Sequence, residues 1–342
     1  MLHTARRLPS RSLRRTLAAT ALVGGLVLTG CTSEDSGSES DSGNGTSDSA
    51  GAEQSEVTIE NMYGEATYHT NPEKVVAIGT AVDSLLALGI TPDVIVERGD
   101  DADADWKNPQ LDGVERIPMS EEFPLEEVVA HDPDLVVGDT YRIKEDAYNE
   151  LSKVTDVLPG MDQDANWEPQ LKALAEIYGM EDKAQEVIDA DEEAFAAVRE
   201  ELPGLEGKTA LTVQDRGGQF VAIAGEDNIA NKFYSRLGMT LPASFTDGSL
   251  KIEAGRAPIS YERVSDLAAN FMGMYATEGM DKIRAIPGYD QLPQVASGAV
   301  VEDNKAVMAA LNIPSSLSNA WLLEQLRDQL EIVDGEDPVD AQ

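Results

Sequence analysis

The side chains best suited to bind a ligand are arginines and aromatic residues that we expect just after the strands of an open α/β sheet. Ligands of such sheets bind beyond the carboxyl ends of the parallel strands. A guanidinium group there can bind anionic oxygens, and an aromatic ring can stack on a flat ligand. For each arginine the alternative is a surface ion pair, and for each aromatic residue it is a hydrophobic core. The predicted ligand-binding residues are Thr80, Arg98, Trp106, Tyr141, Arg142, Trp167, Arg216, Arg256 and Tyr275.

The net charge gives Arg142, Arg216 and Arg256 particular weight. The chain has 26 Lys and Arg residues against 63 Asp and Glu residues, a formal net charge of −37. Its first 30 residues contain five arginines and no acid, so the rest carries 21 cationic and 63 acidic side chains, a net charge of −42. A body this acidic repels nucleic acid and anionic lipid headgroups, so we expect neither as a general partner. An anionic ligand would have to be held by a local arginine cluster.

Residues for metal binding or catalysis are scarce. Cys31 is the single cysteine, which excludes internal disulfides and a cysteine zinc site. The three histidines, one of them in the leader, are too few for a metal site without several carboxylates. There is no G-x-S-x-G elbow, no Walker loop and no G-x-G-x-x-G after the first strand. We therefore predict no catalytic residue, no resident metal and no cofactor, and keep a secreted, lipid-anchored hydrolase as the alternative of a different class.

Residues 1–30 are typical of a signal peptide, with an arginine-rich start, an apolar run over Leu17–Leu28 and small residues after it. The sequence Leu28-Thr29-Gly30-Cys31 is similar to a lipobox, in which the cysteine is diacylated and becomes the new N-terminus. We predict lipidation of Cys31 and attachment to the extracytoplasmic face of the cell membrane through that lipid alone. The alternative is an ordinary signal peptide followed by a free thiol. The Arg14-Arg15 pair leaves Sec and twin-arginine export both open.

Composition and periodicity divide the rest of the chain. We expect the lipidated cysteine and a flexible acidic linker over 31–55, an N-terminal α/β lobe over 56–165, connecting helices over 166–203, a C-terminal α/β lobe over 204–334 and a frayed tail over 335–342. The linker has no aliphatic residue larger than alanine and cannot offset its ordering entropy by burial. In both lobes short apolar strands alternate with helices, which indicates parallel βαβ units.

One long helix is expected to join the two lobes. In Glu181–Leu202, the apolar residues lie within an arc of roughly 100°, with Asp191 as the only charge inside it. At 1.5 Å per residue this segment spans roughly 33 Å, about the width of a small domain. The alternative is a surface helix of one large α/β domain. The apolar residues of the arc are Ala184, Val187, Ile188, Phe195, Val198 and Leu202.

The two halves of the chain also share a local pattern. The segment from Glu126 to Val137 aligns without a gap with the segment from Glu262 to Gly273, 136 residues later. In both, a short helix with a glutamate near its start leads directly into an apolar strand. This pattern predicts that the lobes are internal repeats.

With these motifs the chain resembles the class III substrate-binding proteins of ABC importers, which bind ferric siderophores, haem or vitamin B12. The similarity rests on Pro72–Gly79 with Asp83–Gly89, on Leu125–Val137 and on Ile259–Val264. It implies an α/β fold of two lobes with parallel sheets joined by one long helix, and a monomer that is not an enzyme. A lipid tether fits this family in Gram-positive bacteria. The resemblance also implies that Glu126 and Glu262, with Glu127 as a possible substitute for the first, dock onto arginines of a permease dimer.

Within that family, we predict a ferric siderophore as the ligand. Several arginines at the ends of strands would neutralise an anionic chelate but have no role toward a neutral ligand. Haem, with Tyr141 or Tyr275 as iron ligand, and vitamin B12 remain the alternatives.

Overall fold

A computed structural model describes residues 55–99, 104–163, 166–225, 227–312 and 314–339. Cys31, the predicted signal peptide and all of the predicted linker except residue 55 lie outside these residues. Residues 52–342 form one compact unit, which is described below. Within the described residues, no helix combines the length and the apolar character needed to cross a membrane.

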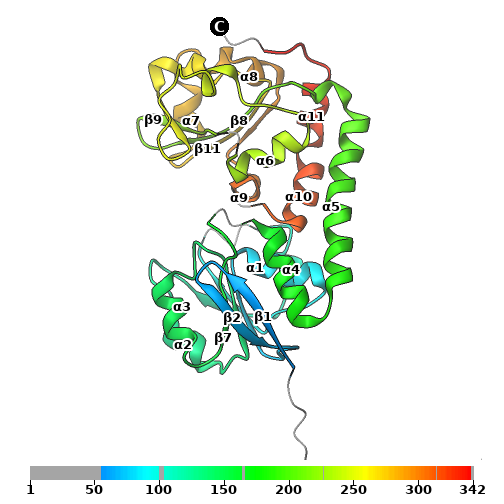
Figure 1. The fold of residues 1–342 in the computed structure, drawn as a ribbon. Coiled ribbons are helices and arrows are strands. Elements are labelled where there is room, and N and C mark those ends of the chain that lie inside the picture. The colour runs from blue at the N-terminus through cyan, green and yellow to red at the C-terminus, as the bar shows by residue number, and fades with distance from the viewer. Residues whose placement is uncertain (1–54, 100–103, 164–165, 226, 313, 340–342) are drawn as a thin grey trace, which may run out of the picture. The chain divides into compact units, whose positions relative to one another are not determined.

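The first lobe contains a five-stranded sheet and a separate two-stranded hairpin (Figure 1). The sheet has the order β5-β4-β3-β6-β7, and all its pairings are parallel, as the sequence predicts. The hairpin β1-β2 is a structure that the sequence analysis did not predict. The elements are β1 Glu56–Asn61, β2 Gly64–His69, β3 Val75–Ile78, α1 Thr80–Leu88, β4 Val94–Glu97, η2 Asn108–Leu111, β5 Glu115–Pro118, α2 Leu125–Ala130, β6 Leu135–Val137, α3 Glu145–Leu151 and β7 Asp156–Leu158.

Two helices follow the first lobe, and a second lobe with its own five-stranded sheet completes the chain. The helices are α4 Trp167–Tyr178 and α5 Glu181–Glu201. The elements after them are η3 Pro203–Leu205, β8 Ala210–Asp215, β9 Gln219–Ile223, α6 Ile229–Arg236, η4 Ala243–Phe245, β10 Arg256–Ser260, η5 Tyr261–Leu267, β11 Phe271–Ala276, α7 Met280–Arg284, η6 Tyr289–Gln291, α8 Pro293–Ser297, β12 Val300–Glu302, α9 Lys305–Asn312, α10 Ser316–Gln325 and α11 Arg327–Asp334.

The second sheet has the order β10-β9-β8-β11-β12 and is mixed. Strand β9 runs antiparallel to both β8 and β10, so the expectation of a purely parallel sheet is wrong for this strand. The reason is the short connection after Asp215, where Gly217 and Gly218 both have positive φ angles and turn the chain back at once. A parallel neighbour would need a crossover of a dozen or more residues.

The internal repeat predicted from the sequence is visible in the topology. Each lobe's sheet has the same spatial order of strands, with the first strand central. Asp134 and Asn270 hold equivalent positions just before β6 and β11. The Asp134 amide donates to the carbonyl oxygen of Lys74 and its carboxylate accepts from the Lys74 amide, at 2.9 and 2.8 Å. Asn270 makes the same two contacts with Thr209, at 3.0 and 3.1 Å.

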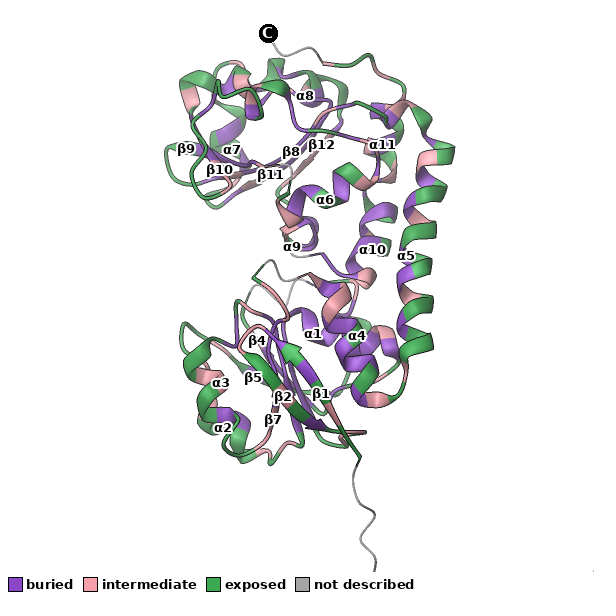
Figure 2. Cartoon of the chain, in the orientation of Figure 1, coloured by how far each residue is buried: buried purple, intermediate pink, exposed green. Residues whose placement is uncertain are grey.

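Helix α5 joins the two lobes, as predicted, and its apolar stripe divides between two hydrophobic cores (Figure 2). The first part of the stripe packs with α1 and α4 in the core of the first lobe, and the last part packs with helices of the second lobe. Ala184 and Ile188 belong to the first core and Phe195, Val198 and Leu202 to the second.

Asp191 lies where α5 passes from one core to the other. Its side chain is buried and forms a 2.6 Å ion pair with Arg236 of α6 and accepts a 3.1 Å hydrogen bond from Asn319 of α10. Burial raises the pKa of this carboxyl group, against the opposing effect of Arg236. The guanidinium of Arg236 also lies over the Phe195 ring, 3.7 Å from its centroid. The charge inside the apolar stripe therefore ties α5 to two helices of the second lobe.

The terminal segment differs from the single amphipathic helix that the sequence pattern predicts over Ser315–Glu331. It forms α10 and α11, which meet at Leu326. Helix α10 begins with a capping box at Ser315, whose hydroxyl accepts from the Ser318 amide. It packs against α1 of the first lobe as well as α5 and α9, so α5 is not the sole helix that contacts both lobes.

Candidate functional site

The carboxyl end of β3, the central strand of the first sheet, is surrounded by two buried ion pairs. Asp83 and Lys107 lie 2.9 Å apart, and Asp139 and Arg142 lie 2.7 Å apart. All four side chains are no more than 8% exposed. Between the pairs is Gly79, with φ at +65°, where an added Cβ would be 1.9 Å from the Asp139 carboxylate. Only glycine lets the chain pass so close to these charges.

Asp139 organises the loop after β6, which carries two of the predicted ligand-binding residues. Its carboxylate accepts from the backbone amides of Tyr141 and Arg142, at 2.9 and 3.2 Å. The side chain of Tyr141 is 49% exposed at this end of the sheet and can contact a ligand. Arg142 is instead buried against Asp139, so the prediction that it offers a free positive charge to a ligand is wrong.

Asp83 is the centre of a second network, which connects the first lobe to the terminal helices. Its carboxylate accepts hydrogen bonds from Trp106 Nε1, Lys107 Nζ and Ser315 Oγ, at 2.5, 2.9 and 2.7 Å. We call these four residues the Asp83 cluster. The Trp106 ring lies 5.5 Å from the ring of Trp321 of α10, between ring centroids. Trp106 therefore lies where the two lobes meet, and its contact with a ligand stays a prediction.

In the second lobe, the carboxyl end of β8 carries a corresponding polar group. Asp215 is buried and accepts a 2.5 Å hydrogen bond from the hydroxyl of Tyr261. That hydroxyl in turn accepts from the Gly218 amide, at 3.1 Å. Arg216 is exposed, and its guanidinium donates to the amide oxygen of Gln214, at 3.0 Å. Among the described residues, the hydrogen bond partner of Arg216 is neutral. The positive charge of Arg216 is therefore not compensated by that partner, and an anionic ligand can approach it.

The two predicted docking glutamates hold equivalent places in their lobes. Glu126 lies in the first turn of α2, which follows the edge strand β5, and Glu262 lies in the first turn of η5, which follows the edge strand β10. Both side chains are exposed. Hydrogen bonds from the Glu262 amide and the Ser260 hydroxyl lower the pKa of Glu262, so it carries its negative charge at neutral pH.

The remaining predicted ligand-binding residues have mixed positions. Arg98 follows β4 and is exposed, at the expected end of the strand, whereas Thr80 is buried in the first turn of α1. Trp167 is buried in the core of the first lobe, and Tyr275 is half-buried and packs against the helix core of the second lobe. For these two aromatic residues, the alternative of a position in the hydrophobic core is therefore the correct one.

The placement of Arg256 after a strand is wrong. It is the first residue of β10 and pairs with Ile223 at the end of β9. It therefore lies at the amino end of β10, whereas Asp215 and Ser260 lie at the opposite edge of the sheet. The segment Glu253–Arg256 is a tight connection that closes on itself through backbone hydrogen bonds, and it is not the end of a strand.

Several residues of these networks were not found from the sequence. Asp139 could have been noticed, because it directly follows the apolar strand β6 and Gly138. Lys107, Trp321 and Ser315 have no such local signal, since their partners are distant in the chain. Within the described residues, no group of three or more His, Cys, Asp or Glu side chains is arranged to hold a metal ion.

Sequence comparison places this chain in a known family. The family model described as "Periplasmic binding protein" matches residues 75–307. A curated relative from Bacillus subtilis, "Probable siderophore-binding lipoprotein YfiY", is 25% identical over 198 residues, which cover 57% of this chain and 58% of that protein. The chain thus spans between a half and two thirds of this relative. "Iron(3+)-hydroxamate-binding protein FhuD", also from B. subtilis, is 24% identical over 254 residues, 72% of this chain and 77% of that protein.

Solved structures with the same fold support the two-lobed architecture. A periplasmic solute binding protein from Mycobacterium smegmatis gives a TM-score of 0.69 at 22% identity, covering 82% of this chain and 99% of that one. The structure of Staphylococcus aureus SirA complexed with staphyloferrin B gives a TM-score of 0.66 at 18% identity, covering 80% and 98%. The predicted fold class is confirmed by these likenesses.

Proposed function

We propose that this chain, which belongs to the periplasmic binding protein family, captures a ferric siderophore outside the cell and delivers it to an ABC importer. The family consists of substrate-binding proteins, and the chain is not an enzyme. The prediction of this family from the sequence motifs is thereby confirmed. The ligand, the permease contact and the lipid anchor are the parts that we propose.

One observation carries the proposal. The two sheets are equivalent, and each has exposed side chains at its carboxyl end that a ligand can reach. In the first lobe, Tyr141 is exposed on a loop held by Asp139, and Arg98 is exposed after β4. In the second lobe, Arg216 is exposed on the β8-β9 turn. Aromatic and cationic side chains of this kind suit a flat, anionic chelate, which a strongly acidic protein would otherwise repel.

The names of similar proteins favour a siderophore over haem or vitamin B12. One relative carries a name for siderophore binding and another for iron(3+)-hydroxamate binding. The SirA structure holds staphyloferrin B, and a Streptococcus pneumoniae PiaA structure with the same fold holds ferrichrome. An anionic carboxylate or catecholate chelate is the class best matched to Arg98 and Arg216. Haem bound through Tyr141 is the second candidate, because that phenol is exposed.

Fluorescence titration tests the ligand directly. The chain has three tryptophans, and two of them, Trp106 and Trp321, lie together where the lobes meet. Ferric catecholate, ferric hydroxamate, ferric citrate-type chelate, haem and cobalamin should be titrated separately. We expect saturable quenching by a ferric chelate, and at least tenfold weaker binding of that chelate to Arg216→Ala. Saturation by haem or cobalamin alone, with no response to any ferric chelate, would refute a siderophore ligand.

We also propose that Glu126 and Glu262 dock onto basic pockets of the two permease subunits. Exposed charges at equivalent points of two lobes can orient a binding protein on a dimeric partner and raise its association rate. Lysine at Glu126, Glu127 and Glu262 together should reduce uptake strongly while ligand affinity in solution stays unchanged. The matched control is lysine at Glu186, Glu193 and Glu200, three exposed acids of α5. Unchanged uptake in the triple variant would remove the docking assignment.

The lipid anchor is proposed at Cys31. The relative YfiY is named as a lipoprotein, which supports this proposal. The Cys31→Ser variant should leave the membrane fraction and partition into the aqueous phase of a detergent extraction, while the wild-type protein partitions with the detergent. Equal partitioning of the two proteins would show that Cys31 carries no lipid.

A further inference from the structure

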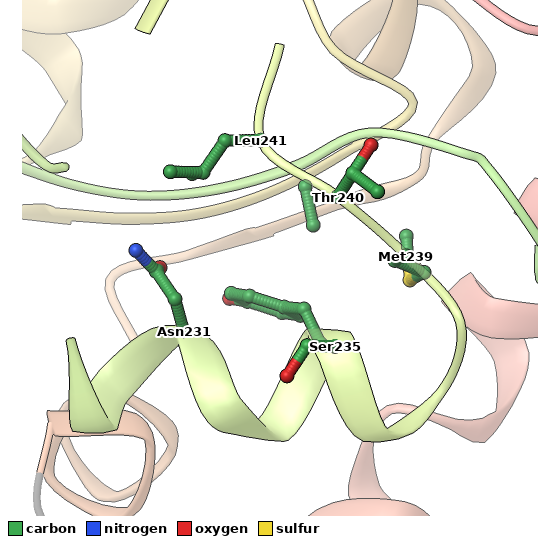
Figure 3. A pocket seen from close by; sticks show the side chains of 7 residues that line it. Asn231, Ser235, Met239, Thr240 and Leu241 are labelled. Carbon is green, nitrogen blue, oxygen red and sulfur yellow. The ribbon is translucent and has the colours of Figure 1, made fainter. Parts of the chain in front are cut away.

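A pocket in the second lobe lies beside the start of β8, away from the proposed ligand-binding ends of the sheets. Figure 3 shows the side chains that line this pocket. It is formed between helix α6 and the segment 239–241, which runs beside the start of β8. Ala210 belongs to its lining and is the first residue of β8, whereas Asp215 ends that strand. The lining residues are Ala210, Asn231, Tyr234, Ser235, Met239, Thr240 and Leu241.

The pocket has apolar walls and a polar mouth. Ala210, Tyr234, Met239 and Leu241 are buried, and they give the walls methyl, thioether and aromatic surfaces. Ser235 and Thr240 are exposed, so they mark the opening to solvent. The volume is about 240 Å³. Since a dry cavity of about 150 Å³ lined by aliphatic side chains is large enough for benzene, one six-membered ring with a substituent fits here.

One side chain of the lining is an unsatisfied hydrogen bond acceptor. Asn231 is 4% exposed, and its Nδ2 donates to the carbonyl oxygen of Gly225, at 2.9 Å. Because that partner can only accept, the amide orientation is fixed and Oδ1 faces away from it. Oδ1 is buried without a hydrogen bond partner among the described residues.

The other buried polar group of the pocket is already satisfied. The hydroxyl of Tyr234 shares a 2.8 Å hydrogen bond with the hydroxyl of Thr212. The pocket thus combines apolar walls with one acceptor that needs a donor. Buried acceptors of this kind are usually bound to a ligand or an ordered water, and a water needs two to four polar partners.

We propose that this pocket is a second ligand site, which binds a small, mainly apolar molecule that carries one hydrogen bond donor and has about the size of phenol. The ring contacts Ala210, Met239 and Leu241, and the donor binds Asn231 Oδ1. The site is independent of the proposed siderophore function, because its residues belong to neither ligand-binding edge nor to the docking glutamates.

The test uses phenol and anisole as probes of the full chain, with binding followed by protein NMR titration and by a crystal structure of the phenol complex. Phenol should bind at one site with a dissociation constant of about 1 mM or tighter. Anisole has the same ring but no donor, and it should bind about tenfold more weakly. In the crystal, the phenol oxygen should lie within hydrogen bond distance of Asn231 Oδ1.

A substitution that blocks the mouth of the pocket distinguishes binding at this site from nonspecific hydrophobic binding. Ser235→Leu adds an aliphatic side chain at an exposed helix position and should abolish phenol binding without unfolding the lobe. Ala197→Leu, at an exposed position of α5, is the matched control and should bind phenol as the wild type does. Equal binding to both variants, equal affinity for phenol and anisole, or a pocket that contains ordered water alone would each overturn the proposal.

Discussion

Asp83 is one of the residues through which the first lobe contacts the segment that leads into α10. Its carboxylate is 2% exposed and accepts three hydrogen bonds, from Trp106, Lys107 and, 232 residues away in the chain, Ser315. A buried carboxylate is tolerated only when its charge and its lone pairs are satisfied. The hydrogen bond from Ser315 therefore adds a buried polar contact between the first lobe and this terminal segment.

A double-mutant cycle measures this contact. Ser315→Ala should reduce the free energy of unfolding by about 1–2 kcal/mol, because it removes both the cap of α10 and the bond to Asp83. In the Asp83→Asn background the same change should cost about 1 kcal/mol less. Ser316→Ala, one residue further on, should stay within about 0.5 kcal/mol of wild type in both backgrounds. Urea unfolding provides the free energy of unfolding of each of these proteins, and strict additivity of the changes at Asp83 and Ser315 would contradict a direct contact.

The turn before α1 gives a second prediction, with a control at the other end of the same helix. Gly79 and Gly89 both have positive φ angles, but an added Cβ meets Asp139 and Arg142 at Gly79 and nothing within 4 Å at Gly89. Gly89→Ala should cost about 1–2 kcal/mol from backbone strain alone. Gly79→Ala should cost at least about 2 kcal/mol more, because it also displaces a buried ion pair. Equal costs in thermal and urea unfolding would show that the loop around Asp139 adapts without loss.

The sequence was enough to predict the exposed residues at the ends of strands, but not the buried ion pairs beside them. Tyr141, Arg98 and Arg216 were identified because each follows an apolar strand, and each is exposed at the end of its strand. The burial of Arg142 depends on Asp139, three residues before it, and on close approach to Gly79. The pairing of Lys107 and Ser315 with Asp83 depends on tertiary folding, for which composition and periodicity contain no signal.

At the scale of elements, the β1-β2 hairpin is attached to the first sheet by few polar contacts, and His69 makes two of them. At the end of β2, its amide and its ring Nδ1 each contact the carboxylate of Asp156 in β7, at 2.8 and 2.9 Å. The hydrogen bond to Asp156, together with the negative charges of Asp156 and Glu56, raises the pKa of His69. The imidazolium form therefore stabilises the folded state.

The raised pKa of His69 predicts that its contribution to the free energy of unfolding decreases as the pH rises. Because the folded pKa lies above the ordinary value of about 6.5, the added stability is fully present below that value and is lost as the pH rises through the folded pKa. The free energy of unfolding of wild type minus that of His69→Gln should be larger at pH 5.5 than at pH 8.5. The change should be below about 1 kcal/mol, because the side chain is half exposed. In an Asp156→Asn background the pH dependence of this difference should become smaller, because only the weaker charge effect of Glu56 remains of the two partners named above, and an undiminished pH dependence there would assign it to another group.

The elements themselves were predicted best where one periodicity continued without a break. The amphipathic patterns of Trp167–Tyr178 and Glu181–Leu202 predict α4 and the joining helix α5 with bounds that agree with the structure within one residue. Asp191 interrupted the stripe in the sequence, and in the structure it lies between the two cores that the helix contacts. The sequence pattern at Asp215–Gly218 predicts a hairpin turn, and a hairpin joins an antiparallel pair of strands, so the expectation of a purely parallel sheet conflicts with the sequence at this point. The break between α10 and α11 had no Gly or Pro to mark it.

At the scale of the whole molecule, the repeat of one strand order places Glu126 and Glu262 at equivalent points of two sheets. The distance between these glutamates depends on the elements that contact both lobes, which are α5, α10 and the Asp83 cluster. The sequence predicted α5 in this role and missed α10, since contact between distant segments cannot be deduced from the pattern of either one. A permease that binds both glutamates would respond to any change in that distance.

A proline in the middle of α5 tests whether this helix sets the spacing of the lobes. Glu193 is exposed and lies between the parts of α5 that belong to the two cores, so Glu193→Pro should kink the helix at a cost of about 3 kcal/mol while each core stays folded. Spin labels on cysteines at Lys153 and Lys282, in a Cys31→Ser background, report the interlobe distance by pulsed electron resonance. We expect a broader distance distribution for Glu193→Pro and an unchanged one for Glu193→Ala, with circular dichroism confirming the fold of both. A distribution as narrow as that of the wild type in the proline variant would assign the spacing to α10 and the Asp83 cluster instead of α5.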